Sequence, residues 1–300
     1  MKKVYIFLLL IVILIIFLSC LNIFYFKENN SSKFEENNSS KFEEYNSHKF
    51  EEYNSSKLKI LNLVLYSPND EYIDMYKLTN KYYKKYKNVD TLYYHFGDLN
   101  NFNNSYKYDK DNNILIIKGK ENYLPGILDK TIKAFKYVEE LEKIKGYNYD
   151  YIVRSNISTI IDFDKLNDKL IRKPIDYGGG IKLVISKGWR DGPSGIDNDR
   201  YEGVQYASGT SIIISRNLLD KILKNSNLID YTVIDDVSIG DFIKKNFPHH
   251  QLHSYEDYFL QTNENIIGSD ISNYIFFRNR NNDRKTDLKI MKYIIDLKSK

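Results

Sequence analysis

Short apolar runs and helical repeats alternate along residues 59–300, and this alternation is typical of an α/β domain. Nearly continuous apolar runs predict buried strands, at residues 58–67, 89–96, 113–119, 149–155, 207–215 and 272–280. Apolar side chains three and four positions apart predict helices, at residues 70–86, 124–146, 216–225, 235–246 and 286–298. The alternation therefore predicts one domain of about 240 residues, a common size for a single folding unit.

The N-terminus carries an uncharged apolar run, residues 4–26, that follows Lys2 and Lys3. A run of this length spans the hydrocarbon core of a bilayer, which needs about 20 residues. The apolar region of a signal peptide is shorter, roughly 7–15 residues, so we favour an uncleaved single-pass anchor. A cleaved signal and a lipidated Cys20 are the alternatives. The two lysines predict a cytosolic tail at residues 1–3 and a C-terminal domain in the lumen or outside the cell.

Residues 27–58 separate the apolar run from the domain and repeat an octapeptide of the type Asn-Ser-Ser-Lys-Phe-Glu-Glu-Tyr. Solenoid repeats are usually about 20 residues or longer, and one Phe per repeat cannot build a core. We therefore predict a disordered stem that holds the domain away from the membrane. Asn30, Asn38 and Asn54 begin glycosylation sequons, which a eukaryotic lumen could modify.

Composition excludes several classes of protein. The chain has 44 basic and 40 acidic residues and a net charge of +4, so it lacks the basic bias of a nucleic-acid-binding protein. We expect no nucleic-acid partner. Cys20 is the single cysteine, which excludes an intramolecular disulfide and a cysteine-based zinc site.

Four motifs follow one another between residues 120 and 245. They are ENYLPGILDKTIKAFKYV from Glu121, YDYIVRSNISTIIDFDKL from Tyr149, YASGTSIIISRNLLDKIL from Tyr206 and DDVSIGDFI from Asp235. In this order and spacing they resemble the beta-1,3-galactosyltransferase and Fringe-like glycosyltransferases. The resemblance implies a GT-A fold, a Rossmann-like mixed sheet flanked by helices. It also implies transfer of a sugar, with inversion, from a UDP-linked donor to a hydroxyl of a glycan or glycoprotein.

The sequence departs from this family at the metal-binding Asp-x-Asp, which the resemblance places at Asn156-Ile157-Ser158. The departing diphosphate must be neutralised either by a metal held on carboxylates or by basic side chains. Support for a Mn²⁺ or Mg²⁺ cofactor is therefore weak, and we assign no metal ligand. Our donor-binding candidates are Arg154, Asn156, Ser158 and Lys130.

Among the basic candidates we prefer Arg154, because it stands at the C-terminal end of a predicted strand, where open α/β sheets bind ligands. The alternative for Arg154 is a surface salt bridge. Four further basic residues are more simply interpreted as solvated charges, namely Lys130, Arg278, Arg280 and Arg284.

Catalysis requires a base that takes the proton of the acceptor hydroxyl. Asp235 and Asp236 stand at a predicted helix start, and the resemblance assigns the base to Asp236; the alternative is that both only favour the helix N-terminus. We expect Ser208 and Gly209 to bring the backbone close to substrate, since glycine has no side chain, and Trp189 to stack on a sugar.

A second glycine-rich segment, Gly178-Gly179-Gly180, lacks the spacing of a dinucleotide-binding loop and predicts a turn or bulge.

Two functions remain open at this stage. One is an active membrane-anchored glycosyltransferase, and the other is a catalytically inactive GT-A-like protein that binds glycans or has a structural role at a surface. The missing Asp-x-Asp favours the second. The first is favoured by retention of Asp235-Asp236, Ser208-Gly209 and Arg154, and we adopt it.

Overall fold

The computed structural model describes residues 57–99, 104–188, 196, 198–281 and 283–299, which all belong to one unit, Lys57–Lys300. The predicted anchor at 4–26, the stem up to residue 56 and Trp189 lie outside these residues. In the part of the chain that the structure describes, no helix combines the length and the apolar character needed to cross a bilayer.

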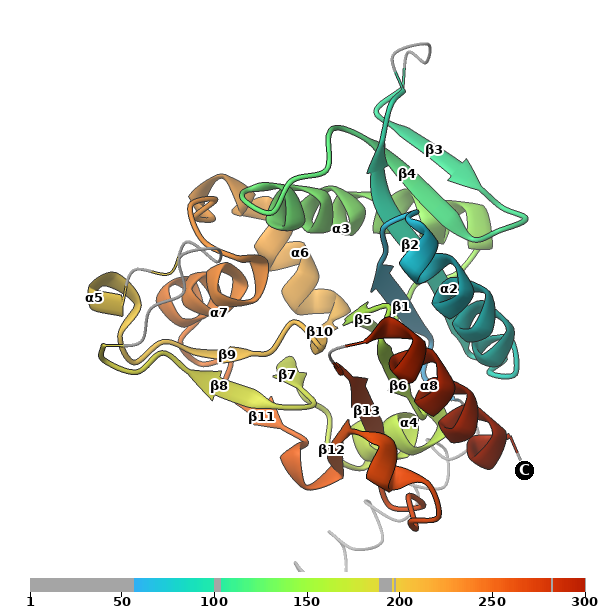
Figure 1. Cartoon of the computed structure of the whole chain (residues 1–300). Helices are drawn as coiled ribbons and strands as arrows, with labels where there is room; N and C mark the ends of the chain where they lie inside the picture. The colour runs from blue at the N-terminus through green and yellow to red at the C-terminus, as the bar shows by residue number, and fades with distance from the viewer. Residues whose placement is uncertain (1–56, 100–103, 189–195, 197, 282, 300) are drawn as a thin grey trace, which may run out of the picture. The chain divides into compact units, whose positions relative to one another are not determined.

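An eight-stranded mixed sheet, ordered β11-β7-β10-β5-β1-β2-β4-β3, forms the centre of the fold (Figure 1). β10 and β3 run antiparallel to their neighbours, whereas β5, β1, β2 and β4 are parallel. The strands are β1 (Ile60–Leu65), β2 (Val89–Gly97), β3 (Tyr106–Asp109), β4 (Ile114–Lys118), β5 (Tyr151–Asn156), β7 (Tyr177–Gly179), β10 (Ser211–Ser215) and β11 (Leu252–Ser254).

Two smaller sheets adjoin the large one. The first has the order β12-β13-β6 and contains β6 (Thr159–Ile161), β12 (Phe259–Thr262) and β13 (Phe276–Asn279). The second is the antiparallel pair β8 (Lys182–Val184) and β9 (Gln205–Ala207).

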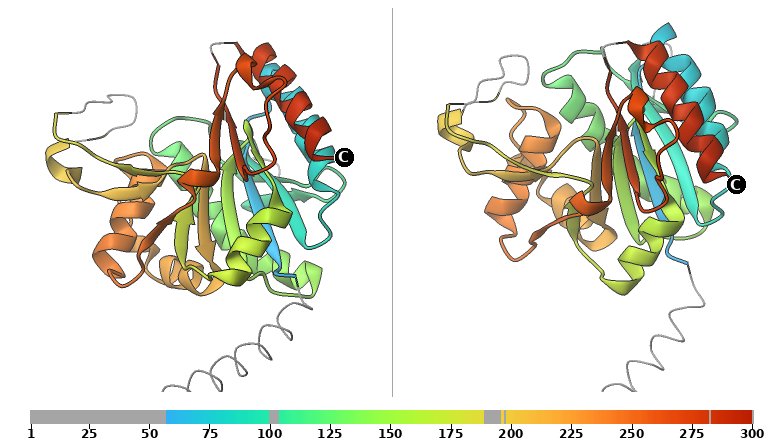
Figure 2. Two further views of the ribbon diagram at one scale, coloured as in Figure 1. Left: turned by 90° about the horizontal axis from the view of Figure 1, so that it is seen from below. Right: turned by 60° about the horizontal axis from the view of Figure 1, so that its bottom comes forward.

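Helices cover both faces of the large sheet. α2 (Asp70–Tyr83) and α8 (Arg284–Lys298) lie side by side on one face (Figure 2), and α4 (Phe163–Arg172) contributes to the same core. The opposite face carries α3 (Gly126–Lys145), α6 (Arg216–Lys224) and α7 (Asp235–Asn246). α5 (Asn198–Tyr201) is a single short turn, and 3-10 helices cover Ser226–Leu228, Glu256–Tyr258 and Glu264–Ile266.

β1 shows why the central strands have nearly continuous apolar sequences. Ile60 and Val64 pack into the core beneath α2 and α8, whereas Leu61 and Leu63 pack into the core beneath α3 and α6. Successive side chains of a strand point to opposite faces, so a strand covered on both faces needs apolar residues at every position.

The sequence correctly predicted most of the large elements, from β1 to α8. The predicted strand 207–215 was wrong in part, because β9 ends at Ala207 and β10 begins at Ser211, with a turn at Gly209. Short strands such as β6 were not predicted, since three-residue strands carry too little periodicity to recognise. The helix α4 was not predicted either.

The prediction of a turn or bulge at Gly178-Gly179-Gly180 was also wrong, because Gly178 and Gly179 lie in β7, between β10 and β11. A Cβ at Gly179 would lie 2.5 Å from the Ser211 carbonyl oxygen, and one at Gly178 would lie 2.8 Å from that of His253. Glycine here permits a close approach of backbones inside a sheet.

Candidate active site

Two adjoining pockets, of about 390 and 500 Å³, open at one edge of the large sheet. Both are lined by Leu65 and Asn156, the last residues of β1 and β5, so they lie at the carboxyl ends of parallel strands. Open α/β sheets bind ligands at this edge. We call the first the tyrosine pocket, because Tyr66 and Tyr72 line it, and the second the aspartate pocket, because Asp235 and Asp236 line it. Both pockets also share Tyr123, Ile127, Arg278 and Arg284.

A buried ion pair joins β5 to the start of α7. The guanidinium of Arg154 lies 2.7 Å from the carboxylate of Asp235, and their side chains are only 2% and 3% exposed. Arg154 also donates to the Asn156 side-chain oxygen at 2.9 Å and to the Gly209 carbonyl. The alternative of a surface salt bridge for Arg154 was therefore right about the ion pair and wrong about its location, because both partners are enclosed.

Asp236, the next residue of α7, is arranged differently. Its carboxylate accepts the backbone N–H groups of Gly209 and Val237, each at 2.9 Å. Burial and then the neighbouring charge of Asp235 raise the pKa of Asp236 to about 6, although the two N–H groups and Arg154 oppose the shift. A carboxylate with a pKa near the working pH is suited to general base catalysis.

The turn at Ser208 and Gly209 packs against Arg154, the partner of Asp235, and against Asp236. A Cβ at Gly209 would lie 3.1 Å from a guanidinium nitrogen of Arg154 and 3.3 Å from a carboxylate oxygen of Asp236. The close neighbours of Gly209 are therefore protein side chains, and its predicted approach to a substrate stays a prediction. Ser208 and Gly209 both line the aspartate pocket.

The positions of the degenerate Asp-x-Asp are each hydrogen-bonded to an arginine. Asn156 accepts from Arg154, and the Ser158 hydroxyl accepts from Arg278 at 2.5 Å. Within the described ranges, no three side chains of the types His, Cys, Asp and Glu gather in a metal-binding arrangement. Asp162, which follows the motif, caps α4 and pairs with Lys298 at 3.1 Å.

Lys130 lies in the tyrosine pocket and is buried, so its interpretation as a solvated charge was wrong. Its ammonium lies 2.5 Å from the carboxylate of Glu121. Burial lowers the pKa of Lys130, and Glu121 partly offsets this effect. The other Glu121 oxygen accepts the Phe96 N–H at 2.9 Å, which fixes the pair at the end of β2.

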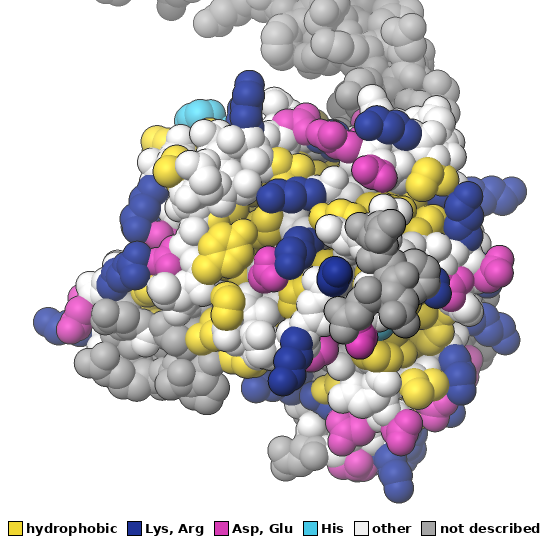
Figure 3. All heavy atoms as spheres, turned by 90° about the horizontal axis from the view of Figure 1, so that it is seen from above, with side chains coloured by type: hydrophobic (Ala, Val, Ile, Leu, Met, Phe, Trp, Pro, Cys, Tyr) yellow, Lys and Arg dark blue, Asp and Glu magenta, His cyan; other side chains and the backbone are white. Residues whose placement is uncertain are grey.

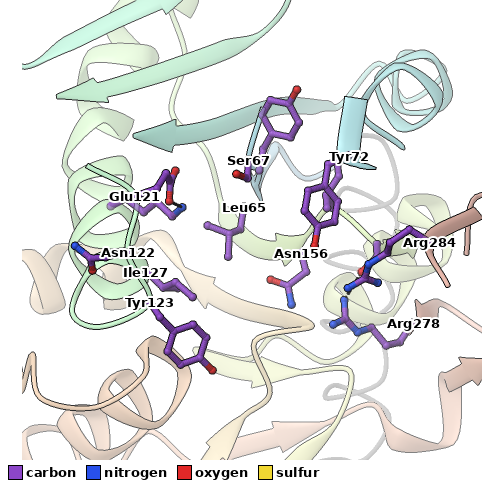
Figure 4. A pocket seen from close by; sticks show the side chains of 14 residues that line it. Leu65, Ser67, Tyr72, Glu121, Asn122, Tyr123, Ile127, Asn156, Arg278 and Arg284 are labelled. Carbon is purple, nitrogen blue, oxygen red and sulfur yellow. Dashed lines mark hydrogen bonds and ion pairs between the residues drawn. The ribbon is translucent and has the colours of Figure 1, made fainter. Parts of the chain in front are cut away.

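Among the late arginines, the interpretation as a solvated charge was wrong for Arg278, whereas Arg280 is exposed as that interpretation expects. Arg278 in β13 is half-buried, and Figure 4 shows it beside Arg284, with both side chains directed toward Asn156. Burial, followed by the charges of Arg280, Arg284 and Arg154, lowers the pKa of Arg278 to about 10. Strand alternation offered no signal for this pair, since β13 ends at Asn279 and Arg280 lies beyond it.

Comparisons with known proteins do not establish the function of this chain. No family model matches the chain, and no curated protein matches it. Among solved structures, the chain is similar to a glycosyltransferase involved in the glycosylation of the major capsid of PBCV-1, with 9% identity and a TM-score of 0.42. The alignment covers 78% of this chain and 98% of that one. A likeness this distant does not define an activity.

Proposed function

We propose that the chain is a membrane-anchored, inverting glycosyltransferase that moves a sugar from a UDP-linked donor to a hydroxyl of a glycan or glycoprotein. The observation that carries this proposal is Asp236, a carboxylate with a pKa raised to about 6 that lines a pocket next to arginines. The mixed α/β sheet flanked by helices is consistent with a GT-A-like fold. The motifs from Glu121 to Ile243 supply the family resemblance.

The reaction assigns a separate task to each pocket. In the aspartate pocket, Asp236 takes the proton of the acceptor hydroxyl, whose oxygen then forms a bond to the anomeric carbon. The bond between that carbon and the diphosphate breaks on the opposite side, which inverts the configuration. The tyrosine pocket would hold the nucleoside, because the half-buried Tyr72 offers an aromatic surface to a base.

Changing Asp236 to asparagine tests the catalytic assignment. The amide keeps the shape of the side chain but cannot take a proton, so we expect transfer to fall about 10²–10⁴-fold. Full-length protein in detergent is first screened for hydrolysis of UDP-sugars, and the donor that turns over is then used to measure transfer.

Asp220→Asn is a suitable control, because Asp220 forms an exposed ion pair within α6 and lines neither pocket. Asp235→Asn is a poor control, because it would leave buried Arg154 without its carboxylate. Wild-type transfer by Asp236→Asn would eliminate Asp236 as the base. A wild-type protein that binds glycans and turns over no donor would favour the inactive, glycan-binding alternative.

The membrane topology rests on residues 4–26 and on Lys2 and Lys3. In sealed microsomes, added protease should leave residues 59–300 intact until detergent is added, because the domain lies in the lumen. Digestion before detergent would contradict this orientation.

A further inference from the structure

The basic residues of the two pockets differ in whether the protein neutralises them. Five line the pockets, and three of these have a carboxylate partner. The pairs are Lys130 with Glu121, Arg154 with Asp235, and Arg284 with Asp287 at 2.6 Å. Within the portion of the chain that the structure covers, no ion pair includes Arg278 or Arg280.

Arg278 is held in place although no described carboxylate pairs with it. Its guanidinium donates to the Ser158 hydroxyl at 2.5 Å, and it is half-buried beside two other arginines. Placing a cation there without a carboxylate costs free energy, which a bound anion would offset. The face shown in Figure 3 likewise has basic side chains close together near its centre, with hydrophobic side chains around them.

The position of Arg278 indicates which anion fits. It lines both pockets, and Arg280, which directly follows β13, lines the aspartate pocket. In a nucleotide sugar, the diphosphate lies between the nucleoside and the sugar, and so would lie where the tyrosine and aspartate pockets meet. Arginine binds phosphate oxygens through two parallel N–H groups, which suits this place.

We infer that Arg278 and Arg280 bind the diphosphate of the donor directly and neutralise its charge as it departs, without a divalent cation. The identity of the ligand rests on the proposed function. Asn156 and Ser158 agree with this assignment, because each accepts a hydrogen bond from an arginine at the positions where the resembled family has metal-binding carboxylates. The structure thus assigns to Arg278 and Arg280 the task first expected of Arg154 and Lys130.

Titration calorimetry on full-length protein in detergent tests this site, with UDP, uridine and inorganic pyrophosphate as probes. We expect UDP and pyrophosphate to bind in EDTA, and Mn²⁺ to change the affinity less than tenfold. Arg278→Gln and Arg280→Gln should each weaken UDP and pyrophosphate at least tenfold and leave uridine unchanged. Arg278→Lys should fall between wild type and Arg278→Gln, because it keeps the charge and loses the paired geometry.

Arg172→Gln is the matched control, because Arg172 is an exposed arginine of α4 that lines neither pocket. Equal loss of uridine and pyrophosphate binding in Arg278→Gln would indicate damage to the fold and overturn the assignment. The assignment would also be overturned by wild-type pyrophosphate binding in both Gln variants, or by a hundredfold gain in UDP affinity with Mn²⁺.

These outcomes separate the inference from the proposed function. A protein that binds UDP through Arg278 in EDTA but transfers no sugar keeps the diphosphate site and loses the catalytic proposal. A protein that transfers sugar only with Mn²⁺ keeps the catalytic proposal and loses the diphosphate site.

Discussion

Arg154 and Arg278 line the same pocket, but among the described residues only Arg154 has a carboxylate partner. Arg154 is fully enclosed. Its guanidinium forms an ion pair with Asp235 and donates hydrogen bonds to Asn156 and to the Gly209 carbonyl. Arg278 is half-buried, and a serine hydroxyl is the one hydrogen-bond partner of its guanidinium among the described residues. The comparison shows that a basic residue in a cleft need not present charge to a ligand, because the protein can supply the counter-ion itself.

The two arginines therefore act on different parts of the site. Arg154 connects the end of β5, the turn at Gly209 and the first residue of α7, and so fixes the neighbouring Asp236. Among the described residues, the guanidinium of Arg278 bonds only Ser158, which agrees with the proposal that its charge serves a ligand. Three stability measurements would break or sharpen this contrast.

The largest effect is expected for Arg154→Met. It leaves the Asp235 carboxylate buried without its cation, and breaking a buried pair in this way typically costs about 3–5 kcal/mol. Urea denaturation followed by circular dichroism measures the loss in free energy of unfolding.

The double variant Arg154→Met with Asp235→Leu is the control for that experiment, since it removes both charges. It should recover most of the loss, because apolar replacement of a buried pair is often neutral. A loss below about 1 kcal/mol in the single variant would contradict the enclosed pair.

A smaller effect is expected in the pH dependence of stability, through Asp236. Burial and the charge of Asp235 raise the pKa of Asp236 to about 6, above its value of about 3.9 in the unfolded chain. The folded protein therefore holds this proton more tightly, so the stabilisation is complete below pH 4 and is lost as the pH rises through about 6. Melting temperatures of wild type and Asp236→Asn at pH 4 and pH 7 measure it.

The asparagine variant does not titrate there, so it should gain stability relative to wild type between these two pH values. The opposite trend would show that the pKa of Asp236 is lowered. Because Arg154 lowers this pKa and contacts its neighbour, Arg154→Met should raise it further, whereas Arg278→Met should not.

The smallest effect is expected for Arg278→Met. The change removes one hydrogen bond to Ser158, worth about 0.5–1.5 kcal/mol, and also removes a half-buried cation that lies among other arginines. These terms oppose one another, so the free energy of unfolding should change by less than about 1 kcal/mol. A loss as large as that of Arg154→Met would end the distinction between the two residues.

Much of the fold follows from local sequence patterns. The apolar runs of β1 and β5 and the repeat of α3 were predicted close to their observed bounds. Burial on one or two faces determines the spacing of apolar residues along the chain, so the spacing indicates the element. The three-residue strand β7 was missed, since its glycines are explained only by the backbones of β10 and β11 beside them.

The sequence by itself determined that Asp235 and Asp236 begin a helix and that Arg154 lies near the C-terminal end of a strand, because hydrophobic periodicity and turn chemistry act between near neighbours. Only the tertiary structure decided which basic residues have a carboxylate partner. Asp235 neutralises Arg154, and Glu121 neutralises Lys130, from different elements of the fold. Ion pairing depends on distance in space, so no local pattern could show that Arg278 would be left for a ligand.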